Sequence, residues 1–279
     1  MSQQRIAFVG GGNMATSMIG GLLARGTAAA DIVVADPDAG QRERLQRQFG
    51  VRTVSAATAA VDGAGTVVLA VKPQQMAEAA QGIAAELAAR PRPVVSVAAG
   101  IRLANLRHWL GDGPPLVRAM PNRPALIGAG ITAAYADPGV GPGERAAVEG
   151  VLSAAGALVW LEDESQMDAV TALSGSGPAY FFLLIEALED AGVTLGLPRA
   201  TARQLAVHTA LGSGRMAAEG TDPPATLREQ VTSRGGTTAA ALAVLEEAGL
   251  RATFGAALAA AARRSAELAD EFGATTGKG

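Results

Sequence analysis

The feature that most constrains the fold of this chain is an alternation of short β-rich runs with helical stretches over residues 6–161. Four apolar runs, 6–9, 32–35, 66–71 and 93–97, have the length and composition of buried parallel strands. Such alternation predicts a doubly wound α/β sheet with helices on both faces. The runs 116–119, 130–135 and 157–161 are expected to extend this sheet, the last as its final strand.

The strand pattern ends near residue 162. Residues 166–272 are rich in alanine and leucine and are punctuated by glycine and proline, which is typical of a bundle of four to six helices. We therefore predict two domains, a sheet domain over 1–161 and an all-α domain over 162–279. Helices such as the one expected over 254–268 have apolar faces too extensive for a small lone domain, which indicates oligomerisation.

Composition excludes several classes of protein. With 49% hydrophobic and 18% charged residues the chain is globular, and a net charge of -3 without a basic run argues against a nucleic-acid partner. The absence of cysteine excludes disulfides and thiolate nucleophiles, and no cluster of metal ligands is apparent. No apolar run approaches the length of a membrane helix, so we expect a cytoplasmic protein without a membrane partner.

A glycine-rich turn, Gly10-Gly11-Gly12-Asn13-Met14-Ala15, directly follows the first predicted strand and precedes a helical run. Gly10 would allow a tight turn, Gly12 the close approach of a pyrophosphate, and Ala15 close packing of the helix on the strand. This context predicts that the sheet domain is a Rossmann-type dinucleotide-binding domain.

Asp36 follows the second predicted strand, where an acidic side chain accepts hydrogen bonds from the adenosine ribose. This position favours NAD over NADP. Arg42 and Arg44 follow closely and could instead meet a 2′-phosphate, and Pro37 could turn Asp36 away. The sequence therefore leaves NADH and NADPH both open.

Two further loops are expected to line the cofactor cleft. Ala70-Val71-Lys72-Pro73 lies at the carboxyl end of a β/α unit and holds one of only two lysines, the other being Lys278. We interpret Lys72 as a ribose or phosphate contact rather than as a solvated loop charge. Met120-Pro121-Asn122 is expected to form a similar loop, although Pro121 could serve only to shape a turn.

Two motifs interrupt the helical region. Ser174-Gly175-Ser176-Gly177-Pro178 divides what would otherwise be one helix over 166–191 and predicts a kink, either for backbone approach to nicotinamide or substrate or for a close helix crossing. Val231-Thr232-Ser233-Arg234-Gly235-Gly236-Thr237-Thr238 is expected to direct N–H groups and hydroxyls into a concavity at a helix N-terminus, a trap for carboxylate or phosphate. Thr237 and Thr238 could also cap that helix.

These motifs, in this order over nearly the whole length, resemble those of bacterial pyrroline-5-carboxylate reductases, and the stretch 231–238 is the most specific of them. The resemblance implies reduction of 1-pyrroline-5-carboxylate to L-proline, the last step of proline biosynthesis, with NADPH or NADH as cofactor. It also implies a homodimer formed through the helical domain, with further assembly into a decamer, a pentamer of dimers.

The resemblance also implies the residues of the site. Thr238 is expected to act as the catalytic residue by hydrogen bonding to the imine nitrogen. The substrate-binding residues are then Ser233, Gly235, Gly236, Thr237 and Thr238. The cofactor-binding residues are Gly10, Gly12, Asn13, Met14, Asp36, Ala70, Val71, Lys72, Pro73 and Asn122. No metal is implied, and a protonated cyclic imine is electrophilic enough to need no strong acid catalysis.

Other classes of protein share parts of this pattern. Reductases of related imines stay open, whereas β-hydroxyacid dehydrogenases use a lysine in the helical domain, and this domain has none before Lys278. Short-chain dehydrogenases need Tyr-x-x-x-Lys, yet Tyr135 and Tyr180 are followed four positions on by Gly139 and Leu184. A non-catalytic dinucleotide sensor would have no use for the intact carboxylate trap.

Overall fold

The structure is a computed structural model that describes residues 5–274, so Lys278 lies outside the described residues. The described chain forms two compact units. Unit 1 comprises residues 5–175 and 261–274, and unit 2 comprises residues 176–260. These units divide the chain by its contacts, and the sequence-based domain boundary near residue 161 stays a prediction.

Unit 1 is built on an eight-stranded sheet with the strand order β3-β2-β1-β4-β5-β6-β7-β8. The strands are β1 (Ile6–Val9), β2 (Ile32–Ala35), β3 (Arg52–Val54), β4 (Thr66–Leu69), β5 (Val94–Ser96), β6 (Leu116–Met120), β7 (Gly130–Ala136) and β8 (Gly156–Trp160). Neighbours from β3 to β6 pair in parallel, whereas β7 is antiparallel to β6 and parallel to β8. The predicted doubly wound sheet is confirmed. Sequence analysis missed β3, because its three residues include only one large apolar side chain.

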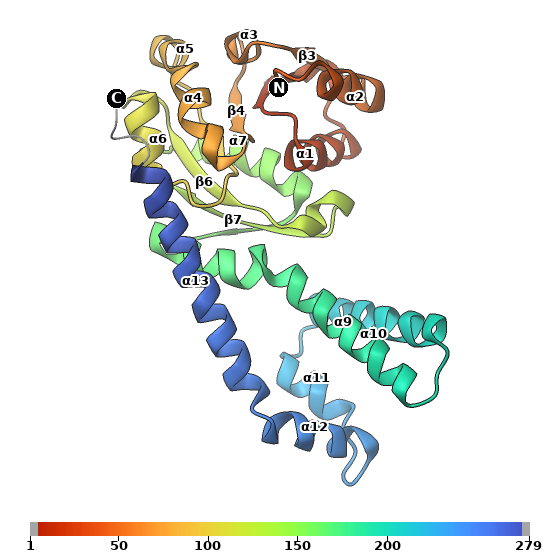
Figure 1. The fold of residues 1–279 in the computed structure, drawn as a ribbon. Helices are drawn as coiled ribbons and strands as arrows, with labels where there is room; N and C mark the ends of the chain where they lie inside the picture. Colours follow the sequence, from red (N-terminus) through yellow and green to blue (C-terminus); the bar gives the residue numbers. More distant parts are fainter. Residues whose placement is uncertain (1–4, 275–279) are drawn as a thin grey trace. The chain divides into compact units, whose positions relative to one another are not determined.

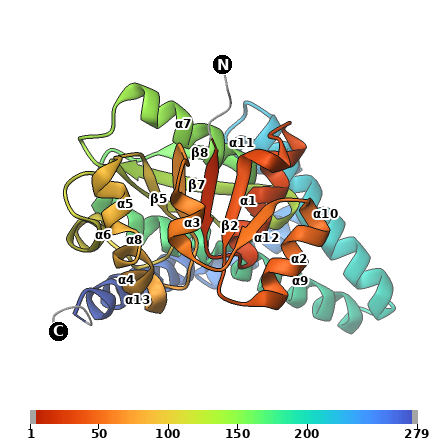
Figure 2. The same ribbon diagram turned by 90° about the horizontal axis from the view of Figure 1, so that it is seen from above.

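Helices cover both faces of this sheet because its strands are apolar on both sides (Figures 1 and 2). One face packs on α1 (Asn13–Ala24), α2 (Ala39–Phe49) and α7 (Pro142–Leu152), and the other on α3 (Ala57–Val61), α4 (Met76–Gln81), α5 (Ala84–Ala89) and α6 (Leu103–Leu110). Single-turn 3-10 segments are η1 (Ala29–Asp31), η2 (Pro73–Gln75), η3 (Arg123–Ile127), η4 (Ser153–Ala155) and η5 (Glu164–Gln166). Along β1, Phe8 enters the first of these cores and Ala7 the second, as the alternation of a strand requires.

Helix α1 approaches η4, the turn that follows α7, more closely than a side chain on α1 would allow. A Cβ added to Gly21 would lie 1.8 Å from the carbonyl oxygen of Ala154, in η4. The neighbouring Ala154 and the α1 residue Met18 are both buried in the same core. Gly21 therefore sets how deeply α1 sits against the sheet.

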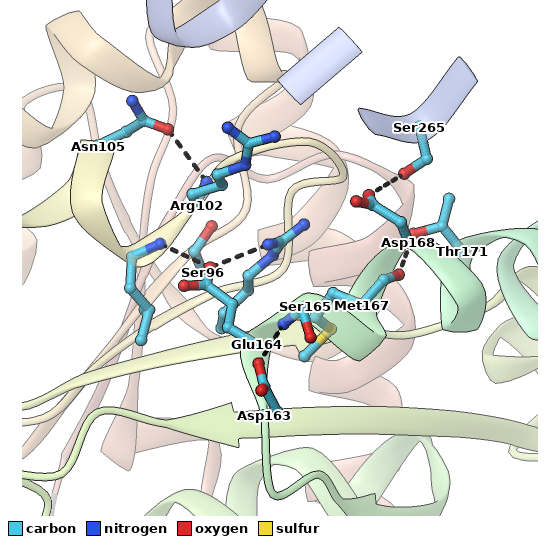
Figure 3. Close-up of polar contacts among 12 residues, drawn as sticks. Ser96, Arg102, Asn105, Asp163, Glu164, Ser165, Met167, Asp168, Thr171 and Ser265 are labelled. Atoms are coloured by element: carbon cyan, nitrogen blue, oxygen red, sulfur yellow. Dashed lines mark hydrogen bonds and ion pairs between the residues drawn. The ribbon is translucent and has the colours of Figure 1, made fainter. Parts of the chain in front are cut away.

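A buried charge pair joins the segment after β8 to the centre of unit 1. The Glu164 carboxylate accepts hydrogen bonds from Arg118 Nη1 on β6 at 2.9 Å and from the backbone N–H of Leu103 at 2.8 Å. Leu103 is the first residue of α6, so the carboxylate also lies at the positive end of that helix (Figure 3). The Arg118 side chain is only 6% exposed, which makes Glu164 its required counter-charge.

The end of the last helix, α13 (Leu250–Ala274), is fastened to unit 1 by two polar contacts. Ser265 Oγ donates to Asp168 at 2.7 Å, and Asp168 lies on α8 (Met167–Val170) (Figure 3). Arg102, the residue before α6, forms an ion pair with Asp270 at 2.7 Å. The chain that leaves unit 1 after residue 175 therefore returns to it through α13.

The predicted interruption of the helix around residues 173–180 is present as a π-helical turn. After α8 the chain forms this turn over Thr171–Gly175, and α9 (Gly177–Thr194) begins two residues later with Pro178 in its first turn. A π turn inserts an extra residue into the helical ladder, and proline is accepted in a first turn because the N–H it lacks has no partner there.

Unit 2 is helical throughout, as predicted. It contains α9, α10 (Arg199–Glu219), α11 (Pro224–Gln230), α12 (Thr237–Glu247) and the beginning of α13. Helices α9 and α10 pack together, and the nearly buried Glu189 of α9 accepts hydrogen bonds from Arg203 Nε at 2.8 Å and Arg199 Nη1 at 2.9 Å on α10. These two guanidinium groups, Arg203 foremost, hold the pKa of Glu189 below its usual range.

Large apolar side chains remain exposed on unit 2 when one chain is considered by itself. Phe181 is 64%, Leu183 66% and Val244 65% exposed. The helical stretch 164–194 is long and apolar enough to cross a membrane by length and composition alone, and 11% of its most apolar window is buried. Sequence analysis expected no such stretch, because it treated the Ser-Gly-Ser-Gly-Pro segment as a break.

We expect Gly21→Ala to destabilise the protein by about 2 kcal/mol, since its Cβ would overlap the Ala154 carbonyl and force α1 outward. The matched control is Gly20→Ala on the same helix, whose Cβ would meet the Phe49 ring at an ordinary 3.6 Å. Urea unfolding of the two variants measures the difference. The control should be neutral or stabilising, because alanine favours helix over glycine. Equal midpoints for both variants would contradict this account.

We expect Glu164→Ala to cost about 3 kcal/mol, because it leaves the buried Arg118 guanidinium without a counter-charge. Asp62→Ala removes an ion pair with Arg90 in which both side chains are at least 70% exposed, and should cost less than about 1 kcal/mol. Chemical denaturation of both variants tests the comparison. A loss for Glu164→Ala no larger than that for Asp62→Ala would show that the buried pair contributes little.

Candidate functional site

A cleft of about 460 Å³ opens in unit 1 at the carboxyl ends of strands β1 to β4. Here the strand order reverses, since β2 and β3 lie on one side of β1 and β4 on the other. Such switch points are where open α/β sheets bind ligands. Its walls are Val9, Gly10 and Gly12 after β1, Ala35, Asp36 and Pro37 after β2, Ser55 and Ala57 after β3, Ala70, Val71 and Lys72 after β4, and Gln75, Glu78, Ala79 and Gly82 beyond.

The floor of the cleft depends on Gly10. Its φ of 96° lies in the left-handed region, and an added Cβ would be 2.8 Å from the carbonyl carbon of Ala70 and 2.9 Å from the Val71 side chain. Each of the two turns is also bonded to a neighbouring strand, because Gly10 N–H donates to Ala35 O of β2 and Ala70 N–H donates to Val9 O of β1, both at 2.8 Å. Gly10 therefore serves both the turn and this close backbone approach.

Gly12 leaves open space at the N-terminus of α1. An added Cβ there would meet no atom within 4 Å, and Gly12 is the N-cap without any side-chain cap. The first N–H groups of a helix point outward without partners and attract anions. Asn13 is exposed at the first position of α1, and Met14 packs partly on the core. This arrangement fits a dinucleotide pyrophosphate.

Asp36 is held in the cleft by the backbone. Its Oδ2 accepts from the Gly11 N–H at 2.8 Å and its Oδ1 from the Asp38 N–H at 2.9 Å. Pro37 therefore does not turn the carboxylate away. Arg42 donates through Nη1 to the carbonyl of Asp36 at 2.7 Å and to that of Pro37 at 2.8 Å.

The other predicted cofactor residues divide into two groups. Ala70, Val71 and Lys72 line the cleft, with Lys72 exposed, and Pro73 begins η2 just beyond it. Asn122 is buried, and its Oδ1 accepts from the Ile131 N–H at 3.0 Å, so its amide orders the turn between β6 and β7. It is not among the residues that line the cleft.

Sequence analysis missed Ser55, Gln75 and Glu78, which also line this cleft. Ser55 follows the unpredicted β3, and the other two lie on η2 and α4. Only the position of the Ala70–Pro73 loop before a helical run could have pointed to Gln75 and Glu78. Short polar segments of this kind have no signal of their own in sequence.

The predicted carboxylate trap lies in unit 2, between α11 and α12. Helix α11 ends at Gln230, and the Thr232 hydroxyl donates to the Arg228 carbonyl at 2.6 Å. Gly235 has a φ of 72°, in the left-handed region, and Gly236 is the N-cap of α12. No side chain caps this helix, so Thr237 and Thr238 do not serve as caps here.

The glycines of this turn leave two helix donors free. Gly236 N–H donates to the Ser233 carbonyl at 3.0 Å, and an added Cβ at Gly236 would lie close to Ser233 Oγ. Gly236 therefore contributes by lacking a side chain rather than by offering its N–H. The N–H groups of Thr237 and Thr238 stand in the first turn of α12, where helices have no internal acceptor.

The structure thus places every predicted cofactor residue in unit 1 and every predicted substrate residue in unit 2. Of the predicted cofactor residues, those that line the cleft are Gly10, Gly12, Asp36, Ala70, Val71 and Lys72. In the part of the chain that the structure describes, no three His, Asp or Glu side chains are placed to hold a metal ion.

Comparison with known families matches both parts of the chain. Residues 5–100 match the family model described as NADP oxidoreductase coenzyme F420-dependent. Residues 164–268 match the model described as pyrroline-5-carboxylate reductase dimerisation. This second match contains α9 to α12 and the Gly235–Thr238 segment.

Similar proteins cover almost the entire chain. It is 49% identical over 274 residues to a pyrroline-5-carboxylate reductase of Pseudomonas aeruginosa, covering 98% of this chain and 100% of that protein. A solved pyrroline-5-carboxylate reductase of Coxiella burnetii superposes with a TM-score of 0.93 at 38% identity, covering 96% of this chain and 99% of that one. One from Plasmodium falciparum with NADP bound gives 0.83 at 27% identity, covering 96% and 99%. The chain belongs to the pyrroline-5-carboxylate reductase family.

Proposed function

We propose that this protein reduces 1-pyrroline-5-carboxylate to L-proline with hydride from NADPH or NADH, the last step of proline biosynthesis. The observation that carries the proposal is the full-length likeness to the P. aeruginosa reductase, which includes both the cleft of unit 1 and the turn of unit 2. The protein is then an oxidoreductase that acts on a carbon–nitrogen double bond.

The turn before α12 is suited to the carboxylate of this substrate. The N–H groups of Thr237 and Thr238 and the positive end of the helix attract an anion, and the exposed Ser233 hydroxyl adds a donor. Gly235 allows the left-handed step that the turn needs, and Gly236 leaves room beside Ser233 Oγ. Backbone donors in fixed positions hold a carboxylate without a buried counter-charge.

Residues of unit 1 are assigned to the cofactor. The N–H groups at Gly12, Asn13 and Met14 hold the pyrophosphate at the α1 N-terminus, and Asp36 and Lys72 lie along the cleft toward the ribose and phosphate groups. Ala70, Val71 and Pro73 shape the wall, and Asn122 orders a neighbouring loop. When bound, a nicotinamide cofactor supplies the hydride.

Thr238 is the residue assigned to the imine. Its side chain is half-buried, and no cap contact of α12 occupies its hydroxyl. A hydroxyl can hydrogen-bond the imine nitrogen and orient the ring while the carboxylate is held by the same turn. The protonated imine is electrophilic already, so this chain needs positioning more than acid catalysis.

The exposed apolar surface of unit 2 supports a homodimer, because it falls within the region that matches the dimerisation family model. We assign the α9 part of the apolar stretch 164–194 to this contact between copies rather than to a membrane. The dimer assembles further into a decamer, and the protein is soluble and cytoplasmic, with no nucleic-acid partner.

We expect the purified protein to consume NADPH or NADH when 1-pyrroline-5-carboxylate is added, as measured by loss of nicotinamide absorbance. Thr238→Ala should lower kcat/KM by about 100-fold, because it removes a hydrogen bond at the reacting nitrogen. The matched control is Thr194→Ala, an exposed threonine of α9 that bonds its own helix through the Asp190 carbonyl, which should retain activity. Cofactor binding without turnover would favour a sensor or a reductase of another imine.

We expect light scattering to give a mass of at least a dimer, and Leu183→Asp on α9 to shift the protein toward monomer by placing a charge on an apolar contact. Leu126→Asp is the control, because Leu126 is also exposed but lies outside the dimerisation match. A monomeric wild-type protein would refute the assembly. Equal masses for the two variants would show that the contact between copies does not involve α9.

A further inference from the structure

We propose that Asp36 makes this protein select NADH over NADPH. The inference rests on the proposed function, since it names which nicotinamide cofactor the cleft of unit 1 takes. Sequence alone left the choice open, because Arg42, Arg44 and Pro37 each offered a reason to expect NADPH. The geometry at the end of β2 removes those three reasons one by one.

The Asp36 carboxylate is held in place. Its backbone N–H donates to the Val54 carbonyl of β3 at 3.1 Å, and its two oxygens accept from the Gly11 and Asp38 N–H groups. Two bonds to the carboxylate and one to the backbone N–H thus fix Asp36 at the cleft wall, despite the proline that follows. An added Cβ at Gly11 would lie 3.2 Å from Asp36 Oδ2 and 2.7 Å from Leu45, so glycine at this position permits the contact.

The hydrogen-bond acceptor sites that remain on the Asp36 carboxylate suit a hydroxyl, and its negative charge repels a phosphate. Two oxygens offer about four acceptor sites, of which the backbone donors occupy two. A ribose 2′-hydroxyl can donate to those that remain. A 2′-phosphate carries two negative charges or nearly so and offers chiefly acceptors, so it faces a like charge with no hydrogen bond to gain.

The nearby arginines are engaged elsewhere. Arg42 donates to the backbone carbonyls of Asp36 and Pro37, and it does not line the cleft. Arg44 donates to Thr16 Oγ1 on α1 at 3.3 Å and does not line the cleft either. Among the described residues, no arginine therefore lines the cleft to bind a 2′-phosphate in this arrangement.

The charge of the whole cleft points the same way. Its charged wall residues are the carboxylates Asp36 and Glu78 and the ammonium of Lys72. Lys72 and the α1 N-terminus are the groups that would balance the charge of the pyrophosphate, which both cofactors carry. The additional phosphate of NADPH therefore enters a cleft in which acidic groups outnumber basic ones.

The test is titration of the intact homo-oligomer with NADH and, separately, NADPH, by isothermal calorimetry without substrate. We expect the wild-type Kd for NADPH to be at least about tenfold weaker than that for NADH, the size of one hydrogen bond to a charged group. Asp36→Ser should weaken NADH and tighten NADPH, so that the ratio of the two Kd values falls at least about tenfold. Asp36→Asn, which removes the charge but keeps the shape, should fall between.

Glu43→Gln is the matched control, because it also removes one carboxylate, from an exposed position on α2 outside the cleft. It should leave the ratio unchanged. Equal wild-type affinities, no binding of either cofactor, or an unchanged ratio in Asp36→Ser would overturn the proposal. A preference for NADH without reduction of 1-pyrroline-5-carboxylate would instead retain this selection and reject the proposed reaction. Equal turnover and equal binding with both cofactors would instead retain the proposed reaction and reject the selection of NADH.

Discussion

The close contact between the turns that follow β1 and β4 is the constraint on which unit 1 depends. These strands are neighbours in the sheet, and the chain leaves them in opposite directions, so their carboxyl ends must part to form a cleft. At Gly10 the backbone comes so near Ala70 that a Cβ would be 2.8 Å from a main-chain carbon. Because this contact involves backbone on both sides, no rotamer change could relieve it. Gly10 packs the floor of the cleft, while Gly12 keeps its entrance at α1 open.

Polar contacts in unit 1 hold two segments that are far apart in sequence, the one that leads to unit 2 and the one that returns from it. Unit 1 is assembled from residues 5–175 and from the end of α13, with all of unit 2 between them in sequence. The buried Arg118–Glu164 pair fixes the outgoing segment on β6 and α6, and the Asp168–Ser265 and Arg102–Asp270 contacts fix the returning helix. The buried Arg118 charge is costly unless it is paired, so it specifies the position of Glu164. This specificity suits a junction through which two units are connected twice.

Unit 2 exposes apolar helix faces that no other described part of the single chain covers. Glu189 and its two arginines satisfy the charged contact between α9 and α10, but Phe181, Leu183 and Val244 face solvent in the single chain. Burial of such side chains is worth roughly 25 cal/mol per Å² of apolar surface, and the single chain does not gain this free energy while they stay exposed. The same region matches a dimerisation family model. Its exposed apolar faces fit the proposed contact between copies, and its uncapped α12 turn fits the proposed substrate site.

Local sequence was sufficient to predict an element wherever the conformational preferences of neighbouring residues decide its structure. The apolar runs at 6–9 and 32–35 became strands at those residues, because their β-branched and apolar side chains fit only a sheet buried on both faces. The glycine-rich turn and the Gly235–Gly236 break were likewise legible, since each requires a backbone that other residues resist. Long-range pairing was not legible. The orientation of β7, the pairing of β3 with β2, and the bond from Gly11 N–H to the Asp36 carboxylate depend on contacts between separate segments. Sequence by itself determined the alternation of strands and helices apart from β3, the positions of the two glycine-rich motifs, and the family. Only the tertiary structure decided which donors and charges face the cleft, because that depends on where separate loops meet.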